Sequence, residues 1–177
     1  MDLKNKILWI TGASSGIGKS LAINLSKENA KLILSSRNKE ALLKVKSSCK
    51  NQENIVVFPL DLNEHAALPS KVTEAMSFFG NIDVLVNNGG ISQLSLAKDT
   101  NIMVDKKLMD VNYIGTVALI KAILLYFIEN EKGHLVVTTS IVGKIGRSLR
   151  FSYATTKHAL HGFFDSLRAE ILKENIK

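Results

Sequence analysis

The chain has 177 residues, 46% of them hydrophobic, and a formal net charge of +7. This length supports one domain with a sizeable core, and this composition excludes an intrinsically disordered chain. The Lys and Arg residues are scattered through predicted helices, without a dense basic block or interleaved aromatic residues. We therefore predict no nucleic-acid binding, whereas contact with an acidic membrane surface stays open.

Cysteine content and hydropathy indicate a reducing compartment. Cys49 is the only cysteine, so no internal disulfide can form, and we expect it to pack within a helix. Residues 1–6 are too polar and too few for a signal peptide. The most apolar stretch, 113–128, is shorter than the ~20 residues that a membrane span needs and contains Lys121. The chain alone therefore predicts a cytoplasmic protein without a membrane span, in which this stretch is a buried helix.

Strand and helix patterns alternate along the chain. The strands are short apolar runs, as expected for parallel strands buried on both faces, and the helices show apolar stripes. Asn63 and Ser152 are the predicted N-caps of two helices. In chain order we predict strands at 7–10, 32–34, 55–60, 82–86 and 134–139, and helices around 21–25, at 38–49, from 63 to 79, from about 104 to 130 and from 152 onwards.

This alternation predicts a single domain over residues 1–177 with an α/β fold. The fold is a Rossmann-type, doubly wound parallel sheet with helices on both faces. Ligands bind such sheets beyond the carboxyl ends of the strands. Every polar motif falls at one of those ends: 11–18, 35–37, 61, 87–90 and 140.

The turn after the first strand carries a glycine motif of the form Gly-x3-Gly-x-Gly. Such a turn lets the backbone approach a pyrophosphate, and the helix that follows offers free N–H groups and a favourable dipole. The spacing differs from the G-x-G-x-x-G form, and a tight turn without a ligand is the alternative. We predict that this turn binds a dinucleotide cofactor through Gly12, Ser14, Ser15, Gly16, Ile17 and Gly18.

Arg37 follows the second strand, where an acid usually grips a free ribose 2′-hydroxyl. No acid lies between positions 35 and 39. The guanidinium fork of Arg37 suits a 2′-phosphate instead, so we predict NADP(H) rather than NAD(H). A solvated arginine is the alternative.

Two further strand ends complete the predicted cofactor site. Asp61 can accept a hydrogen bond from the adenine amino group, or it can cap a turn, and its neighbour Leu62 belongs to the same predicted site. Asn88 and Gly89 belong to a turn at 87–90 that lets the backbone pass close to the adenosine ribose. A simple strand-to-loop turn is the alternative for that segment.

Tyr153 and Lys157 are the predicted chemical pair, because carbonyl reduction needs a hydride on carbon and a proton on oxygen. They lie four residues apart and therefore share one helix face. The reference pKa of tyrosine is ~10, and a nearby ammonium group and the helix N-terminus both lower it. Tyr153 is thus the predicted proton donor, and we also count Tyr153 and Lys157 among the cofactor-binding residues.

Two more side chains belong to the predicted chemical end. Ser140, at the end of the fifth strand, can donate to the substrate oxygen and hold it near Tyr153. Asn112, in the long helix, can hold a water that relays protons to Lys157, and a solvated helix face is its alternative. His158 and His161 lack a third ligand, so we predict no metal site.

These motifs together resemble the short-chain dehydrogenase/reductase family. The chain carries Thr-Gly-x3-Gly-Ile-Gly at 11–18, Asn-Asn-x-Gly at 87–90, and the family's Asn, Ser, Tyr and Lys at Asn112, Ser140, Tyr153 and Lys157. One departure is Gly89, where the family usually has alanine. The resemblance covers essentially the whole chain.

The resemblance implies an NADP(H)-dependent carbonyl reductase or dehydrogenase acting on small apolar substrates such as steroids, retinoids or lipids. It also implies a homodimer through the helices near 104–130 and 152–176. Relatives are held at the endoplasmic reticulum membrane by an N-terminal hydrophobic segment, which residues 1–177 do not contain.

The family is longer than this chain, with two more strands, a Pro-Gly turn and a substrate loop beyond the position of Lys177. We therefore expect a fragment of a longer enzyme, incomplete at its C-terminal end, with an open edge at the fifth strand and little or no turnover. The alternative function is a nucleotide-binding regulatory protein with an idle site.

Overall fold

The computed structural model describes residues 3–177. Five strands alternate with helices, as the sequence predicts. The strands are β1 (Ile7–Thr11), β2 (Lys31–Ser35), β3 (Ile55–Val57), β4 (Val84–Asn87) and β5 (His134–Val137). The helices are α1 (Gly16–Lys27), α2 (Lys39–Ser47), α3 (Leu68–Ser77), α4 (Ile102–Leu108), α5 (Gly115–Glu129) and α6 (Phe151–Glu170).

All neighbouring strands are parallel, and their order in the sheet is β3-β2-β1-β4-β5. The chain moves outward from β1 to β3 and then returns to β4 on the other side of β1. This reversal is a topological switch point, where the connections after β1 and β4 run to opposite faces of the sheet and leave a crevice for a ligand. The arrangement confirms the predicted doubly wound fold.

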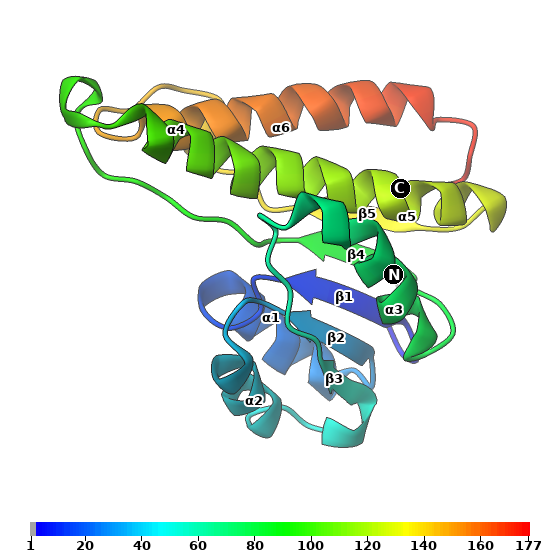
Figure 1. Ribbon diagram of the computed structural model, residues 1–177. Coiled ribbons are helices and arrows are strands. Elements are labelled where there is room, and N and C mark those ends of the chain that lie inside the picture. The colour runs from blue at the N-terminus through cyan, green and yellow to red at the C-terminus, as the bar shows by residue number, and fades with distance from the viewer. Residues whose placement is uncertain (1–2) are drawn as a thin grey trace.

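Side chains alternate between two apolar layers along each strand. Leu8 and Ile10 belong to a cluster with residues of α1 and α2, whereas Trp9 belongs to a cluster with residues of α3, α5 and α6. Figure 1 shows α1 and α2 on one side of the strands and α5 and α6 on the other. Burial on both faces explains why the strand sequences are continuously apolar.

The long predicted helix forms as α4, a π-helical turn over Met109–Ile114 and α5, in direct succession. Among residues 3–177, the segment Ile102–Glu129 is long and apolar enough to cross a membrane, with a mean hydropathy of 1.8. Its side chains Leu119, Ile120 and Phe127 are fully buried within the fold. One side of this segment therefore packs in the core, as we predict for residues 113–128, while 44% of its most apolar window is buried in all.

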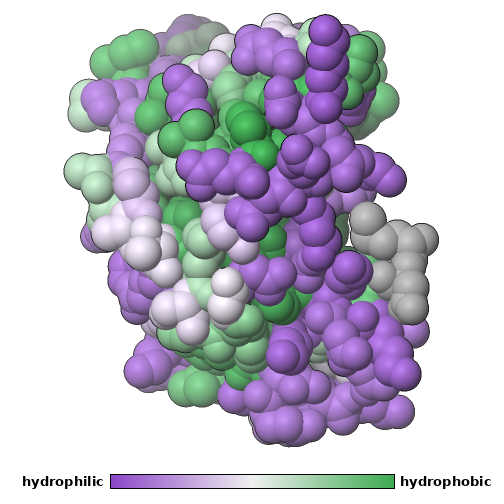
Figure 2. Space-filling model, turned by 90° about the vertical axis from the view of Figure 1, so that its right-hand side faces the viewer, coloured by the Kyte–Doolittle hydropathy of each residue, from purple (hydrophilic) through white to green (hydrophobic). Residues whose placement is uncertain are grey.

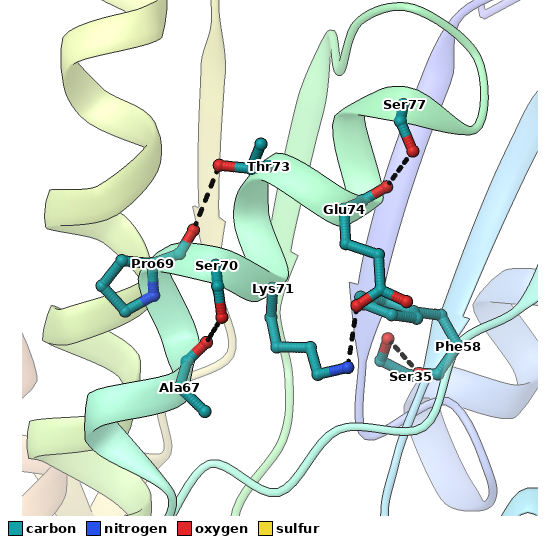
Figure 3. A network of polar contacts seen from close by, with 9 residues as sticks. All are labelled: Ser35, Phe58, Ala67, Pro69, Ser70, Lys71, Thr73, Glu74 and Ser77. Carbon is teal, nitrogen blue, oxygen red and sulfur yellow. Dashed lines mark hydrogen bonds and ion pairs between the residues drawn. The ribbon is translucent and has the colours of Figure 1, made fainter.

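Both predicted N-caps are wrong. Asn63 lies in a turn, a short 3-10 turn at His65–Ala67 follows, and α3 begins only at Leu68. Figure 3 shows the start of α3, where Oγ of Ser70 donates to the carbonyl of Ala67 at 2.8 Å. Ser152 lies inside the first turn of α6, and its hydroxyl donates to the carboxylate of Asp105 in α4. A contact with another helix has thus replaced the local cap.

The edge of the sheet at β5 is partly covered, in contrast to the open edge that we expect from the sequence. The backbone N–H of Leu135 donates to the carbonyl of Lys177 at 2.7 Å, and that of Lys177 donates to Gly133 at 3.1 Å. Gly133 and Ile176 form a parallel bridge. The last residues of the chain therefore pair with this edge strand.

The amino-terminal end of the sheet holds a buried carboxylate, Asp83, which is 8% exposed. Its Oδ2 accepts the N–H of Ile7 at 2.9 Å, and its Oδ1 lies 2.7 Å from Nζ of Lys132 and 3.8 Å from Nζ of Lys6. Asp83 thus joins β1, β4 and the segment before β5.

Figure 2 views the molecule from the side of the chain termini, where hydrophilic residues cover much of the surface.

Candidate active site

A cleft of about 990 Å³ opens at the carboxyl ends of the strands. It contains eight of the predicted cofactor-binding residues: Gly12, Ser14, Ser15, Arg37, Asp61, Leu62, Asn88 and Gly89. Of the other five, Gly16, Ile17 and Gly18 form the start of α1 behind this turn, and Tyr153 and Lys157 lie in α6, outside the lining of the cleft. The predicted nucleotide motifs from four parts of the sequence, one after each of β1 to β4, therefore meet in one place.

The glycine turn is packed against the turn after β4. Gly12 has φ of +65°, and a Cβ there would lie 2.7 Å from Cα of Gly89. A Cβ on Gly18 would lie 2.4 Å from the carbonyl oxygen of Gly12. Both positions therefore require glycine, one for backbone conformation and close approach, the other for close approach alone.

Thr11 locks these two turns together, and sequence reasoning missed its role. Its Oγ1 accepts the N–H groups of Asn88 at 3.1 Å and Gly89 at 3.0 Å. In return, Nδ2 of Asn88 donates to the carbonyls of Thr11 and Gly12, both at 3.2 Å. A threonine as the first residue of the glycine motif is the only sequence signal for this contact.

The segment that follows β2 forms one wall of the cleft. It places two cationic residues there, Arg37 and Lys39. Glu40 also lines the cleft, one residue beyond the acid-free window of the sequence. Across the cleft, Oδ1 of Asp61 accepts the N–H of Asn63 at 2.9 Å. Asp61 therefore caps a turn, which is one of the two roles that the sequence leaves open for it. Its second oxygen, Oδ2, takes no part in this hydrogen bond.

Asn112 is 1% exposed, so its alternative role on a solvated helix face is wrong. It lies in the π-helical turn, where its Oδ1 accepts the N–H of Ile91 at 2.8 Å. Its Nδ2 donates to the carbonyl of Ile91 at 2.9 Å and to Oγ1 of Thr156 at 3.1 Å. Asn112 thus clamps the loop after β4 onto α6, while its water-holding role stays a prediction.

Tyr153 and Lys157 share one face of α6, as predicted. Nζ of Lys157 lies 5.6 Å from the centre of the Tyr153 ring. Lys157 is 5% exposed, and this burial lowers the pKa of its ammonium group to about 8. Its Nζ donates to the carbonyl of Thr138 at 2.8 Å, and Oγ1 of Thr138 donates to Oδ1 of Asn88 at 3.1 Å. Lys157 is thereby connected to the glycine turn.

Ser140 follows β5 and begins a short 3-10 turn, Ile141–Gly143. This turn packs on α6, since a Cβ on Gly143 would lie 3.0 Å from Cβ of Lys157. The packing brings Ser140 to the part of α6 that carries the chemical pair. The main cleft is not lined by Ser140, Tyr153 or Lys157, which lie beyond its end at Ile91.

Among residues 3–177, no group of three or more His, Cys, Asp or Glu side chains could hold a metal ion. Nδ1 of His158 lies 2.9 Å from the carbonyl oxygen of Ala154, one turn earlier in α6. Cys49 is buried, and this burial raises the pKa of its thiol.

We expect Lys157→Met to stabilise the fold at pH 7 by on the order of 1–3 kcal/mol, because burial of the charged form is unfavourable. The folded pKa of Lys157 is about 8, below the ordinary 10.5, so the cost is complete below pH 8. As the pH rises from about 8 to 10.5 this cost disappears, and the gain in the variant disappears with it. Urea unfolding of both proteins between pH 7 and pH 10 measures the effect.

The exposed Lys121 of α5 provides the matched control, since Lys121→Met should leave the free energy of unfolding nearly unchanged. A gain at Lys157 that does not shrink with rising pH would contradict a cause in the buried charge.

Residues 6–177 match the family model of the short chain dehydrogenases. The chain therefore belongs to the short-chain dehydrogenase/reductase family, a family of oxidoreductases that use nicotinamide cofactors. The fold and the combined motifs agree with this membership, which confirms the resemblance stated from the sequence.

Among its relatives, human dehydrogenase/reductase SDR family member 7 is 44% identical over 175 residues, covering 96% of this chain and 52% of that protein. Mouse member 7B is 40% identical over 180 residues, covering 99% of this chain and 56% of that protein. The chain thus spans about half the length of the curated relatives it matches.

Two solved structures show the same fold. A short-chain dehydrogenase from Streptomyces avermitilis superimposes with a TM-score of 0.92 at 26% identity, covering all of this chain and 64% of that chain. Levodione reductase also gives a TM-score of 0.92, at 25% identity, covering 99% of this chain and 69% of that chain.

Proposed function

We propose that the protein is an NADP(H)-dependent oxidoreductase that interconverts carbonyl and hydroxyl groups by hydride transfer. The observation that carries the proposal is the buried Lys157 ammonium beside Tyr153, connected through Thr138 to the glycine turn. A buried cation next to a phenol has a chemical use, because it can stabilise the negative charge that develops on the phenol oxygen during proton transfer.

In the proposed reduction, the hydroxyl of Ser140 holds the substrate oxygen and the phenol of Tyr153 gives it a proton. The cofactor, when bound, supplies the hydride that the carbonyl carbon accepts. Lys157 keeps the resulting phenolate stable until a proton returns from solvent. Oxidation of an alcohol is the reverse, with Tyr153 as the base.

The residues of the cleft fit a dinucleotide. The positions of Gly12 and Gly18 exclude a side chain where the backbone must approach a pyrophosphate, and the N-terminus of α1 lies behind them. Arg37 and Lys39 provide positive charge at the other end of the cleft, where a 2′-phosphate would bind. This charge supports NADP(H) rather than NAD(H).

We expect Arg37→Ala to weaken NADPH binding by about tenfold and to leave NADH binding within about twofold, since an ion pair of this kind is worth roughly 1.4 kcal/mol. Fluorescence titration of the 177-residue chain with each cofactor measures this. Equal affinity of the unaltered protein for NADPH and NADH would contradict the assignment. Arg147→Ala, an exposed arginine outside the cleft, is the control.

For substrate and assembly we propose a small apolar steroid-, retinoid- or lipid-like compound and a homodimer. Ile141 follows Ser140 directly and Ile145 lies five residues beyond it; they are 71% and 59% exposed, which supports an apolar substrate. Exposed Leu125 of α5 and Leu172 beyond α6 support a dimer through these helices. We also propose attachment at the endoplasmic reticulum, which cell fractionation tests.

A further inference from the structure

The loop after β4 leads from the cofactor cleft to the start of α6, and it is held at several points. Both backbone groups of Ile91 bind Asn112. The carbonyl of Gln93 accepts Nη1 of Arg150 at 3.0 Å, and the N–H of Ser95 donates to the carbonyl of Leu149 at 3.2 Å. Residues 91–95 therefore lie against the segment that begins the helix of Tyr153.

Gln93 itself is unusual in this loop. Its side chain is 8% exposed, and both atoms of its amide, Nε2 and Oε1, are buried without a hydrogen-bond partner among residues 3–177. Most buried polar side chains have a partner, and a glutamine amide can donate two hydrogen bonds and accept two. The nearby Asn112 shows the ordinary case, since both its amide atoms are paired.

The unpaired amide cannot be explained by the fixing of the loop. Four hydrogen bonds to backbone atoms already hold residues 91–95, and the side chains of Ser92 and Ser95 also bind Arg150 and Thr100, so the loop is fixed without the Gln93 side chain. A buried polar group without a partner lowers stability, whereas an apolar side chain of similar length would not. Within residues 3–177, no contact of the Gln93 amide accounts for its burial.

We propose that Gln93 is a specificity-determining residue that binds a second oxygen of the substrate, apart from the carbonyl that reacts. The substrate class is then an otherwise apolar ketone with a further carbonyl or hydroxyl group, since the amide can donate to the first and accept from the second. This proposal rests on the proposed function. A site built to bind a polar group discriminates against an analogue that lacks it, because its own polar atoms stay unpaired.

The test compares hexanone with hexanediones whose two carbonyls are adjacent or separated by one or two carbons. We expect whatever turnover the 177-residue chain has with NADPH to favour one dione over hexanone by about tenfold or more in kcat/KM. Gln93→Met, which keeps the length of the side chain, should reduce this preference about tenfold and leave hexanone within about twofold. An unchanged preference would overturn the proposal.

The second glutamine of the chain, Gln52, is the matched control, because it is exposed and distant from the cleft. Gln52→Met should keep the preference. If instead Gln93→Met lowers the Tm of the ligand-free protein and leaves the preference unchanged, the amide holds a buried water and the proposal is wrong.

A chain that reduces none of the four ketones would contradict the proposed function without deciding the role of Gln93. Ligand-induced stabilisation of the chain in NADP⁺ then decides it. We expect a dione to raise Tm more than hexanone does, and Gln93→Met to erase that difference. Equal stabilisation of the unaltered protein by all four ketones would overturn the proposal.

Discussion

Tyr153→Phe is expected to lower kcat for carbonyl reduction by about 10²–10⁴-fold, the usual contribution of a positioned acid. The change removes one hydroxyl and leaves the ring beside Lys157. Binding of NADPH should stay within about twofold, since the cleft is not lined by Tyr153. The loss therefore belongs to the chemical step and not to assembly of the site.

Steady-state kinetics and NADPH titration of the same preparations measure this pair of effects. Tyr126→Phe is the control, because Tyr126 lies in α5, remote from the cleft, and should change neither quantity. If the Tyr153→Phe protein turns over as fast as the unaltered protein, Tyr153 is not the acid of the reaction. A chain that binds NADPH but turns over no carbonyl with Tyr153 intact would instead be a nucleotide-binding protein with an idle site.

The sheet could be predicted from the sequence because its strands are buried on both faces and separated by amphipathic helices. The N-caps could not. Ser152 has the right residue type for a cap, but its hydroxyl binds Asp105, which is 47 residues earlier in the chain. Asn63 likewise precedes a turn that only the path from β3 to α3 determines. Capping preferences are local, whereas these contacts depend on how the helices pack.

The site shows the same division. The proximity of Tyr153 and Lys157 follows from their spacing in one helix, and that of Gly12 and Gly18 from their place in one turn. Both could therefore be predicted from the sequence. Thr11, Thr138 and the clamp formed by Asn112 join segments that are far apart in the chain. No periodicity predicts such contacts, and they emerge only when parallel strands bring their carboxyl ends together.

At the amino-terminal end of the strands, opposite the cleft, Asp83→Ala is expected to lower the free energy of unfolding at pH 7 by about 2–3 kcal/mol. The change leaves the N–H of Ile7 buried without its acceptor and separates Lys132 from its partner. Because Asp83 contacts both β1 and the segment before β5, its loss weakens the sheet on both sides of β4. Urea denaturation with a two-state fit measures the difference.

The dependence on pH identifies the ion pair as the cause. Burial favours the neutral form of Asp83, but the hydrogen bond and charge of Lys132 and the N–H of Ile7 outweigh it, so the pKa of this carboxyl lies below its ordinary 3.8. The stabilisation is therefore complete above about pH 4 and is lost as the pH falls through the lower, folded pKa. The two proteins should thus converge in stability at strongly acid pH. Asp99→Ala, which changes an exposed aspartate, is the control. If the stability difference between Asp83→Ala and the unaltered protein stays the same at acid pH, the loss comes from packing and not from the ion pair.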